Sequence, residues 1–444
     1  MSIRHINIFC PPLSILGDFH LGRAIPLILI DVQVRYNIFK LRFGPTHHDR
    51  FIINVFDKSF NIFCRGFESI SNTWSRNGLD VSKMVKSLIK AYQANRVFLN
   101  LLPDGEYSWQ KETVLVVKKL EFRDDMKLFG ETVNNAILDL YQKGILTLGI
   151  RNHKPNLFLN TSFLFRVSGF HDCLDSIITY PVRCRKEMMT RIDSIEHTSY
   201  CEKFPILIWK KYGIKLANNI ASDFGIVTRV SREDTSPTIA SLFAFLFIPA
   251  FFQKISGDSV IDFMPSSITN LTRYNLMSLV TIYALNKNCA QRSIIFYGKL
   301  GLPSNVPLKK FYGSKAYPDS IRFLIIDQLS ERTKVFSEDG LSFFQDGTIV
   351  PRKYIRCQYQ LCLLRTLFPA EDIVNQERFA GVVSYTWLSQ FSDTMEQCDF
   401  RKAFLILIKE LDRLYALRSS TNNKKLKEEI NLLLDAFRIF LPKT

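Results

Sequence analysis

The sequence predicts a multidomain α+β protein with a strand-rich N-terminal part and a mainly helical C-terminal part. Three observations support this fold class. The 444 residues exceed what one hydrophobic core usually serves, so several domains are expected. The apolar pattern partly alternates, with a period near two, at the N-terminus and changes to helical spacing at about residue 80. Hydrophobic residues make up 47% of the chain, which supplies packed cores and argues against disorder.

Residues 1–79 are predicted to form a strand-rich domain. Residues 25–43 and 50–63 are rich in Ile, Val, Phe and Tyr, and both stretches partly alternate between apolar and polar side chains. The segment GPTHHD between them is typical of a turn. We therefore expect a small antiparallel sheet at the N-terminus.

Residues 80–167 form the second predicted domain. Asp80 is a good N-cap for a helix that reaches about residue 95. On a helical wheel the apolar side chains gather on one side of this helix and a basic side lies opposite. The basic side consists of Lys83, Lys86 and Lys90.

A second helix of this domain, from about residue 131, is followed by a basic hairpin. Gly144 sits where a helix C′ glycine belongs, and two strands are expected at 145–150 and 157–165. Their turn carries Arg151, His153 and Lys154. This order resembles the C-terminal part of a winged-helix domain, and the resemblance implies that the hairpin would contact phosphates. The solvent side of the helix bears carboxylates and no arginine, so contacts with protein remain an alternative.

The rest of the chain divides into a predicted helical domain, 168–300, and a mixed and then helical domain, 301–444. The apolar run 239–252 falls short of the ~20 residues that a membrane-spanning helix needs, so a buried core helix is expected there. A Gly-turned hairpin is expected at about 337–354. The final helix is well patterned, with apolar residues at helical spacing: Leu426, Ile430, Leu433, Phe437 and Phe440.

The charge balance indicates a polyanionic partner. Lys and Arg number 58 against 42 Asp and Glu, which gives a formal net charge of +16. Such a surplus raises the local concentration of polyanions around a protein. Nucleic acid is therefore the first expectation, with DNA favoured over RNA, and no membrane association is predicted. An acidic membrane surface and an acidic protein are the alternatives on charge alone.

The candidate nucleic-acid-binding residues cluster in short basic stretches. KKFYGSKAY interleaves lysines with aromatic residues, a combination that neutralises a backbone and stacks on single-stranded bases. YPVRCRK and VPRKYIR add two basic clusters, and Arg356 belongs to the second. The candidates are Lys83, Lys86, Lys90, Arg151, His153, Lys154, Arg183, Arg185, Lys186, Lys309, Lys310, Tyr312, Lys315, Arg352 and Lys353.

An enzymatic alternative rests on Asp18 and His20 in LSILGDFHLGR. This D-x-H element resembles the first metal-binding element of calcineurin-like metallophosphoesterases, and the resemblance implies a two-metal centre that hydrolyses phosphoesters. The later GDxxD-like, GNH(D/E) and GHxH elements of that family are absent from the sequence. A degenerate nuclease pattern running from Asp104 to Glu121 has Arg123 where a catalytic lysine is expected, and arginine handles protons poorly. The sequence therefore favours a protein without enzymatic activity, cofactor or bound metal.

The cysteines and the N-terminal segment indicate in which cellular compartment the protein is expected. Nine cysteines are scattered without a CxxC pair, and the nearest two, Cys357 and Cys362, fit packed thiols better than metal ligands. The N-terminal apolar stretch is short, interrupted by proline and without a cleavage pattern. Both features favour reduced thiols and a cytoplasmic location.

The sequence thus predicts a non-enzymatic nucleic-acid-binding protein, a subunit of a larger nucleoprotein assembly, that uses basic patches on the phosphate backbone. Protein partners in a complex are expected because apolar helices such as residues 402–417 exceed what one buried face requires. The first alternative is a protein-interaction or structural subunit whose winged helix contacts protein. A metal-dependent nuclease or phosphoesterase is the less favoured one.

Overall fold

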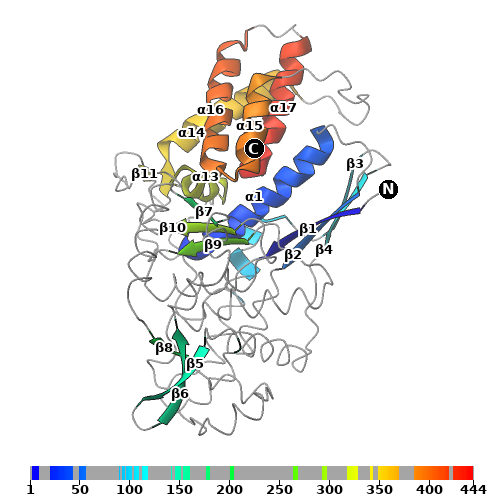
Figure 1. The fold of residues 1–444 in the computed structure, drawn as a ribbon. Coiled ribbons are helices and arrows are strands. Elements are labelled where there is room, and N and C mark those ends of the chain that lie inside the picture. Colours follow the sequence, from blue (N-terminus) through cyan, green and yellow to red (C-terminus); the bar gives the residue numbers. More distant parts are fainter. Residues whose placement is uncertain are drawn as a thin grey trace.

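The structure is a computed structural model, in which one long buried helix packs against a C-terminal group of helices and the described strands form four separate sheets (Figure 1). Most of the residues whose side chains are described lie in helices. The structure describes residues 3–9, 21–43, 50–56, 90, 93–95, 97–102, 105–109, 113–118, 142, 146–151, 154–160, 177–180, 201–204, 264–268, 293–297, 318–328, 341–343, 349–369, 385–419 and 424–443.

Helix α1 (Leu21–Phe43) occupies the residues that were predicted as the first strand. That prediction, and with it the strand-rich N-terminal fold class, is wrong. Ile28, Leu29 and Val32 are 0% exposed, and nearly every described residue of the helix is buried. A helix that is buried on all sides lacks a polar stripe, so its apolar run cannot be told from a buried strand by periodicity. Its 23 residues are the better signal, because strands seldom exceed about ten.

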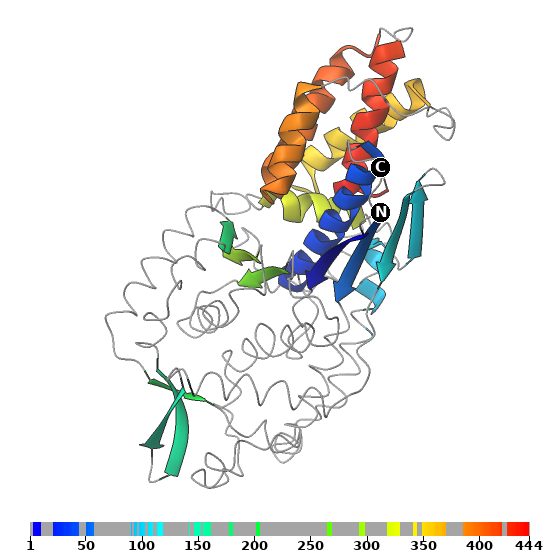
Figure 2. The ribbon, with the colours of Figure 1, turned by 45° about the vertical axis from the view of Figure 1, so that its right-hand side comes forward.

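The N-terminal sheet is mostly parallel, where an antiparallel sheet was predicted. Its order is β1 (Ile3–Phe9), β2 (Arg50–Phe56), β4 (Thr113–Lys118) and β3 (Gly105–Trp109). β1, β2 and β4 run parallel, and only β3 is antiparallel to its neighbour β4. Parallel neighbours need a crossover connection, which α1 supplies between β1 and β2. Figure 2 shows α1 alongside this sheet and reaching the C-terminal helices.

The predicted basic hairpin forms, as part of a three-stranded sheet. β5 (Leu146–Arg151) pairs antiparallel with β6 (Lys154–Asn160). The third strand, β8 (Cys201–Phe204), pairs with β6 from outside the predicted winged-helix domain. A winged helix is therefore not supported. The helix expected from residue 131 lies outside the described residues except for Gln142, which is helical.

Two smaller sheets complete the described strands. β7 (Ile177–Tyr180), β10 (Ser293–Tyr297) and β9 (Met264–Ile268) form a parallel sheet in that order. β11 (Leu341–Phe343) and β12 (Ile349–Pro351) form the hairpin predicted near residue 340. The apolar run 239–252 lies outside the described residues. Within the part of the chain that is described, no helix is both long and apolar enough to cross a membrane.

The C-terminal helices are α13 (Pro318–Gln328), α14 (Arg352–Leu367), α15 (Thr386–Glu396), α16 (Phe400–Ala416) and α17 (Lys424–Phe440). All five apolar positions that predicted the final helix are buried in α17. They face the core because they recur at helical spacing along one side.

Phe404 of α16 is the centre of the aromatic core between these helices. It is 1% exposed, and its ring lies 5.2 Å from that of Phe323, 5.0 Å from that of Phe440 and 6.0 Å from that of Phe437. Offset and edge-to-face contacts at such distances add to the hydrophobic gain of burying the rings. One residue therefore joins α13, α16 and α17.

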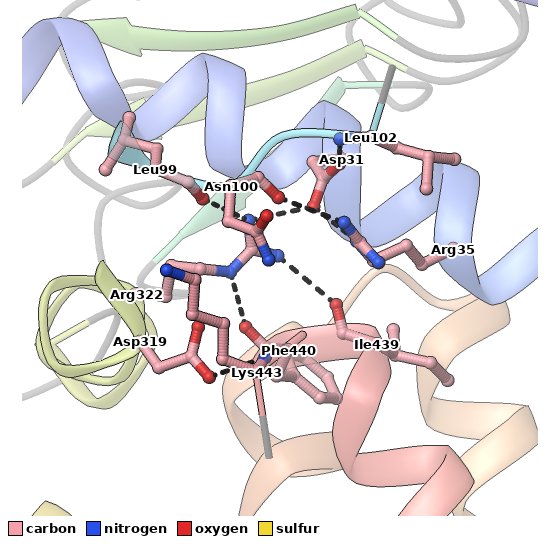
Figure 3. Close-up of polar contacts among 10 residues, drawn as sticks. All are labelled: Asp31, Arg35, Leu99, Asn100, Leu102, Asp319, Arg322, Ile439, Phe440 and Lys443. Carbon is pink, nitrogen blue, oxygen red and sulfur yellow. Dashed lines mark hydrogen bonds and ion pairs between the residues drawn. The ribbon is translucent and has the colours of Figure 1, made fainter. Parts of the chain in front are cut away.

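Arg322 of α13 is 0% exposed and contacts α1 and the end of α17 (Figure 3). Its Nη1 lies 2.8 Å from Oδ2 of Asp31 in α1. Its Nε donates to the carbonyl oxygen of Phe440 at 2.5 Å, and Nη2 donates to that of Ile439 at 3.3 Å. A cation at the last carbonyls of a helix is stabilised by the helix dipole. Burial lowers the pKa of Arg322, and the charge of Asp31 opposes that shift.

Asp31 is shared with a second arginine. Arg35 Nε lies 2.7 Å from Asp31 Oδ2, and Arg35 Nη2 donates to the carbonyl oxygen of Asn100 at 3.0 Å. The backbone N–H of Leu102 donates to Asp31 Oδ1 at 2.6 Å. With Asp319 of α13, these side chains form what we call the Arg322 cluster: Asp31, Arg35, Asp319 and Arg322. The cluster joins α1, residues 99–102, α13 and the end of α17.

A pH prediction follows from Asp319, the least satisfied member of the cluster. It is 2% exposed, and among the described residues its Oδ1 has no hydrogen-bond partner, although Oδ2 accepts from the N–H of Lys443 at 2.9 Å. Burial raises the pKa of Asp319 above its ordinary value of 3.8, against the opposing effects of the Lys443 bond and Arg322. The folded state therefore holds the proton more tightly than the unfolded state, and wild-type stability falls as pH rises through the folded pKa.

We expect Asp319→Asn to be more stable than the wild type at neutral pH, because the amide keeps an acceptor for Lys443 without a buried charge. The advantage should vanish below the ordinary value of 3.8, where both states of the wild type are protonated. Urea unfolding of both proteins across this pH range measures the difference. A variant that is less stable than the wild type at neutral pH would contradict the prediction.

Candidate nucleic-acid interface

Helix α14 has a basic outer side. Its sequence RKYIRCQYQLCLLRTL contains four cations and no Asp or Glu. The inner side packs Tyr354, Cys357, Leu361 and Leu364 against the other helices. This division leaves the charges on the solvent side. The exposed cations are Arg352, Lys353, Arg356 and Arg365.

An exposed tyrosine lies among these cations. Tyr359 is 64% exposed, and Ile355, one turn earlier, is 41% exposed. Residues three and four apart share one side of a helix, so Tyr359 neighbours both Ile355 and Arg356. We call the surface formed by Arg352, Ile355, Arg356 and Tyr359 the α14 face. A large ring left in water among cations offers a flat stacking surface with positive charge beside it.

The N-terminus of α14 lacks electrostatic compensation. Arg352 and Lys353 stand in its first turn, which contains no acidic residue, and Pro351 provides no side-chain cap. Cations at this end oppose the helix dipole, whereas an anion there is stabilised by the free N–H groups. Lys353 Nζ lies 3.8 Å from Asp327 Oδ2, and its side chain is 73% exposed, so this ion pair offsets little of the charge.

Arg356 is held by an acid from the neighbouring helix α16. Asp412 Oδ1 accepts from Arg356 Nη2 at 2.7 Å and from Gln360 Nε2 at 2.8 Å. Gln360 is only 8% exposed, whereas the Arg356 side chain is 69% exposed. An exposed pair of this kind contributes at most about 1 kcal/mol to stability. Its main effect is to fix the direction of the guanidinium group.

The two cysteines of α14 lie on different sides of the helix. Cys357 is buried and Cys362 is exposed. Burial raises the pKa of Cys357 to about 12, so its thiol stays protonated at neutral pH and is a poor metal ligand. Among the described residues, no group of three or more His, Cys, Asp and Glu side chains could hold a metal ion.

The structure brings together two of the predicted binding residues, Arg352 and Lys353, at the start of α14. Arg151 and Lys154 lie opposite each other at the end of the β5–β6 hairpin, and Lys90 is an exposed helical residue. Asp18 and His20 lie outside the described residues, as do the remaining candidate binding residues. These remaining candidates are Lys83, Lys86, His153, Arg183, Arg185, Lys186, Lys309, Lys310, Tyr312 and Lys315.

The sequence prediction missed Tyr359 and Arg365. A signal for Tyr359 was present, because a helix that begins at Arg352 places residues 355, 356 and 359 on one side.

Comparison with solved structures finds proteins that are named as tRNA synthetases. No protein-family model matches the sequence, and no curated protein matches it. Among solved structures, Mycobacterium tuberculosis methionyl-tRNA synthetase with methionyl-adenylate is similar at 10% identity and a TM-score of 0.49, over 100% of this chain and 92% of that chain. A ternary complex of Agrobacterium radiobacter K84 agnB2 LeuRS with tRNA is similar at 10% identity and a TM-score of 0.47, over 100% of this chain and 84% of that chain. A Campylobacter jejuni putative arginyl-tRNA synthetase is similar at 8% identity and a TM-score of 0.44, over 99% of this chain and 91% of that chain.

These findings correct the predicted function. The structures found are named as synthetases, whereas the sequence predicted a non-enzymatic nucleic-acid-binding subunit of a nucleoprotein assembly. The alternative of a winged helix used for protein contacts is corrected as well, since the winged helix itself is not supported. The preference for DNA over RNA has no support in these findings.

Proposed function

We propose that this protein binds RNA through the α14 face, with a single-stranded base stacked on Tyr359 and neighbouring phosphates paired with the cations around it. The observation that carries the proposal is the 64% exposure of Tyr359 on a helix with four cations and no acidic residue. Aromatic rings stack on any base, and cations beside them neutralise the backbone. The net charge of +16 favours the same class of partner.

Single-stranded RNA segments fit this face better than a duplex. A ring can stack on a base only when that base is unpaired and turned outward, and folded RNA presents such bases in loops and bulges. A duplex would offer the α14 face only phosphates, for which an exposed tyrosine is not needed. The proposed contact is therefore one or a few loop nucleotides.

The test compares Tyr359→Ala with the wild type in binding titrations at several salt concentrations. A stacked base is worth about 1–3 kcal/mol by alanine substitution, so we expect affinity for a hairpin RNA to fall by about tenfold or more. The salt dependence should stay unchanged, because the ring carries no charge. Stability should change by less than about 0.5 kcal/mol, since the side chain is mostly exposed.

Leu417→Ala is the matched control, because Leu417 is also an exposed apolar residue, 43% exposed, at the end of a different helix. It should bind as the wild type does. The titration also includes a tRNA, a single-stranded DNA of the same sequence as the hairpin loop, duplex DNA and anionic lipid vesicles. Binding to vesicles alone, or undiminished RNA binding by Tyr359→Ala, would rule out the proposal.

A further inference from the structure

Asp412 of α16 pairs with Arg356 of the α14 face, and the inference drawn from this pair rests on the proposed function. Asp412 Oδ1 lies 2.7 Å from Arg356 Nη2, within hydrogen-bond distance. No described carboxylate pairs with Arg352, which is equally part of the face. The two arginines therefore differ in freedom although they share one surface.

The carboxylate that pairs with Arg356 has a second, buried partner. Asp412 Oδ1 also accepts from the amide of Gln360, at 2.8 Å, and Gln360 is 8% exposed. Loss of this contact would leave the buried amide without its acceptor, so the carboxylate favours the position in which it meets Gln360. The guanidinium that shares this oxygen therefore has a preferred direction before any ligand arrives.

The orientation matters because of the neighbouring ring. Arg356 precedes Tyr359 by three residues, so the two side chains are adjacent on the helix surface. Only one donor, from Nη2, is used by Asp412, which leaves the N–H groups of Nη1 and Nε. A base that stacks on Tyr359 would present its edge beside these donors. Guanine carries two neighbouring acceptors, O6 and N7, that match a planar guanidinium, whereas adenine has a donor at the corresponding position.

We propose that Asp412 is a positioning residue that aims Arg356 at the edge of the base stacked on Tyr359 and thereby makes the α14 face prefer guanine. A free arginine would instead pair with the nearest phosphate, which carries no base information. Asp412 thus gives a charged surface a preference among bases without touching the RNA.

The experiment uses the full chain and hairpin RNAs whose loops are all uridine except for one central guanine, adenine or cytosine. The wild type should bind the guanine loop about tenfold more tightly than the adenine loop. Asp412→Ala should bind both with nearly equal affinity, and its affinity for an all-uridine loop should be unchanged or higher, since a negative charge near the RNA is removed. A merely structural role would weaken binding to every loop alike.

Two further variants separate charge from geometry. Arg356→Lys keeps the charge but not the planar donor group, so it should lose the guanine preference as Asp412→Ala does. Arg413→Lys makes the same change at an acid-paired arginine of α16, outside the α14 face, and should keep the preference. If the wild type binds RNA without preferring guanine, or if Asp412→Ala keeps the preference, the inference is overturned and RNA binding by the α14 face stands. If no loop is bound at all, the proposed function and this inference fail together.

Discussion

Arg322→Met should lower the free energy of unfolding by about 3–5 kcal/mol, the cost of removing one partner from a buried ion pair. The variant would leave Asp31, 4% exposed, without one of its two guanidinium partners. It would also leave the last carbonyls of α17, those of Ile439 and Phe440, without a donor. Hydrogen exchange reports stability element by element, and the loss should concentrate in the amides of α1 and α17.

Two controls accompany this experiment. Arg365→Met makes the same change at an exposed arginine of α14 and should alter stability by less than about 0.5 kcal/mol. The double variant Arg322→Met with Asp31→Asn should recover part of the loss, because Asn keeps an acceptor for Leu102 without an unpaired buried charge. Equal stability of Arg322→Met and the wild type would show that the cluster contributes nothing to holding α1 against α17.

Phe404→Ala should lower the stability of the C-terminal helices by about 3–5 kcal/mol. The side chain is 1% exposed and contacts rings of α13 and α17, so its removal leaves a cavity that three helices line. Faster hydrogen exchange in α13, α16 and α17 would report the loss. Leu405→Ala, the next residue of the same helix and 37% exposed, is the control and should have a small effect. A similar effect of both substitutions would argue against the aromatic core described here.

The elements with one polar and one apolar side could be predicted from the sequence. α17 was found because its apolar residues recur at helical spacing, and the β5–β6 hairpin because its strands flank a polar turn. α1 could not be found in this way, since a helix buried on all sides has no periodic contrast. The parallel pairing of β1 and β2 was missed for the same reason, because only a helix between them permits it.

The candidate site was predictable only in part. Arg352 and Lys353 stood out as a basic cluster, but the exposure of Tyr359 depends on which side of α14 the other helices cover. The partnership of Arg356 and Asp412 joins residues 56 positions apart. That of Asp31 and Arg322 joins α1 and α13. A single sequence contains no signal for such pairs, because their geometry arises only once the helices have packed.

Because α1 packs against α17, the folding of α1 can be completed only after α17 has been synthesised. α1 leaves the ribosome well before the helix that covers part of it, because that helix begins only at Lys424. At ~5–20 residues per second, synthesis of the intervening chain takes roughly 20–80 s. For that time the nascent chain carries an apolar helix that lacks its final cover, whichever other elements have already formed.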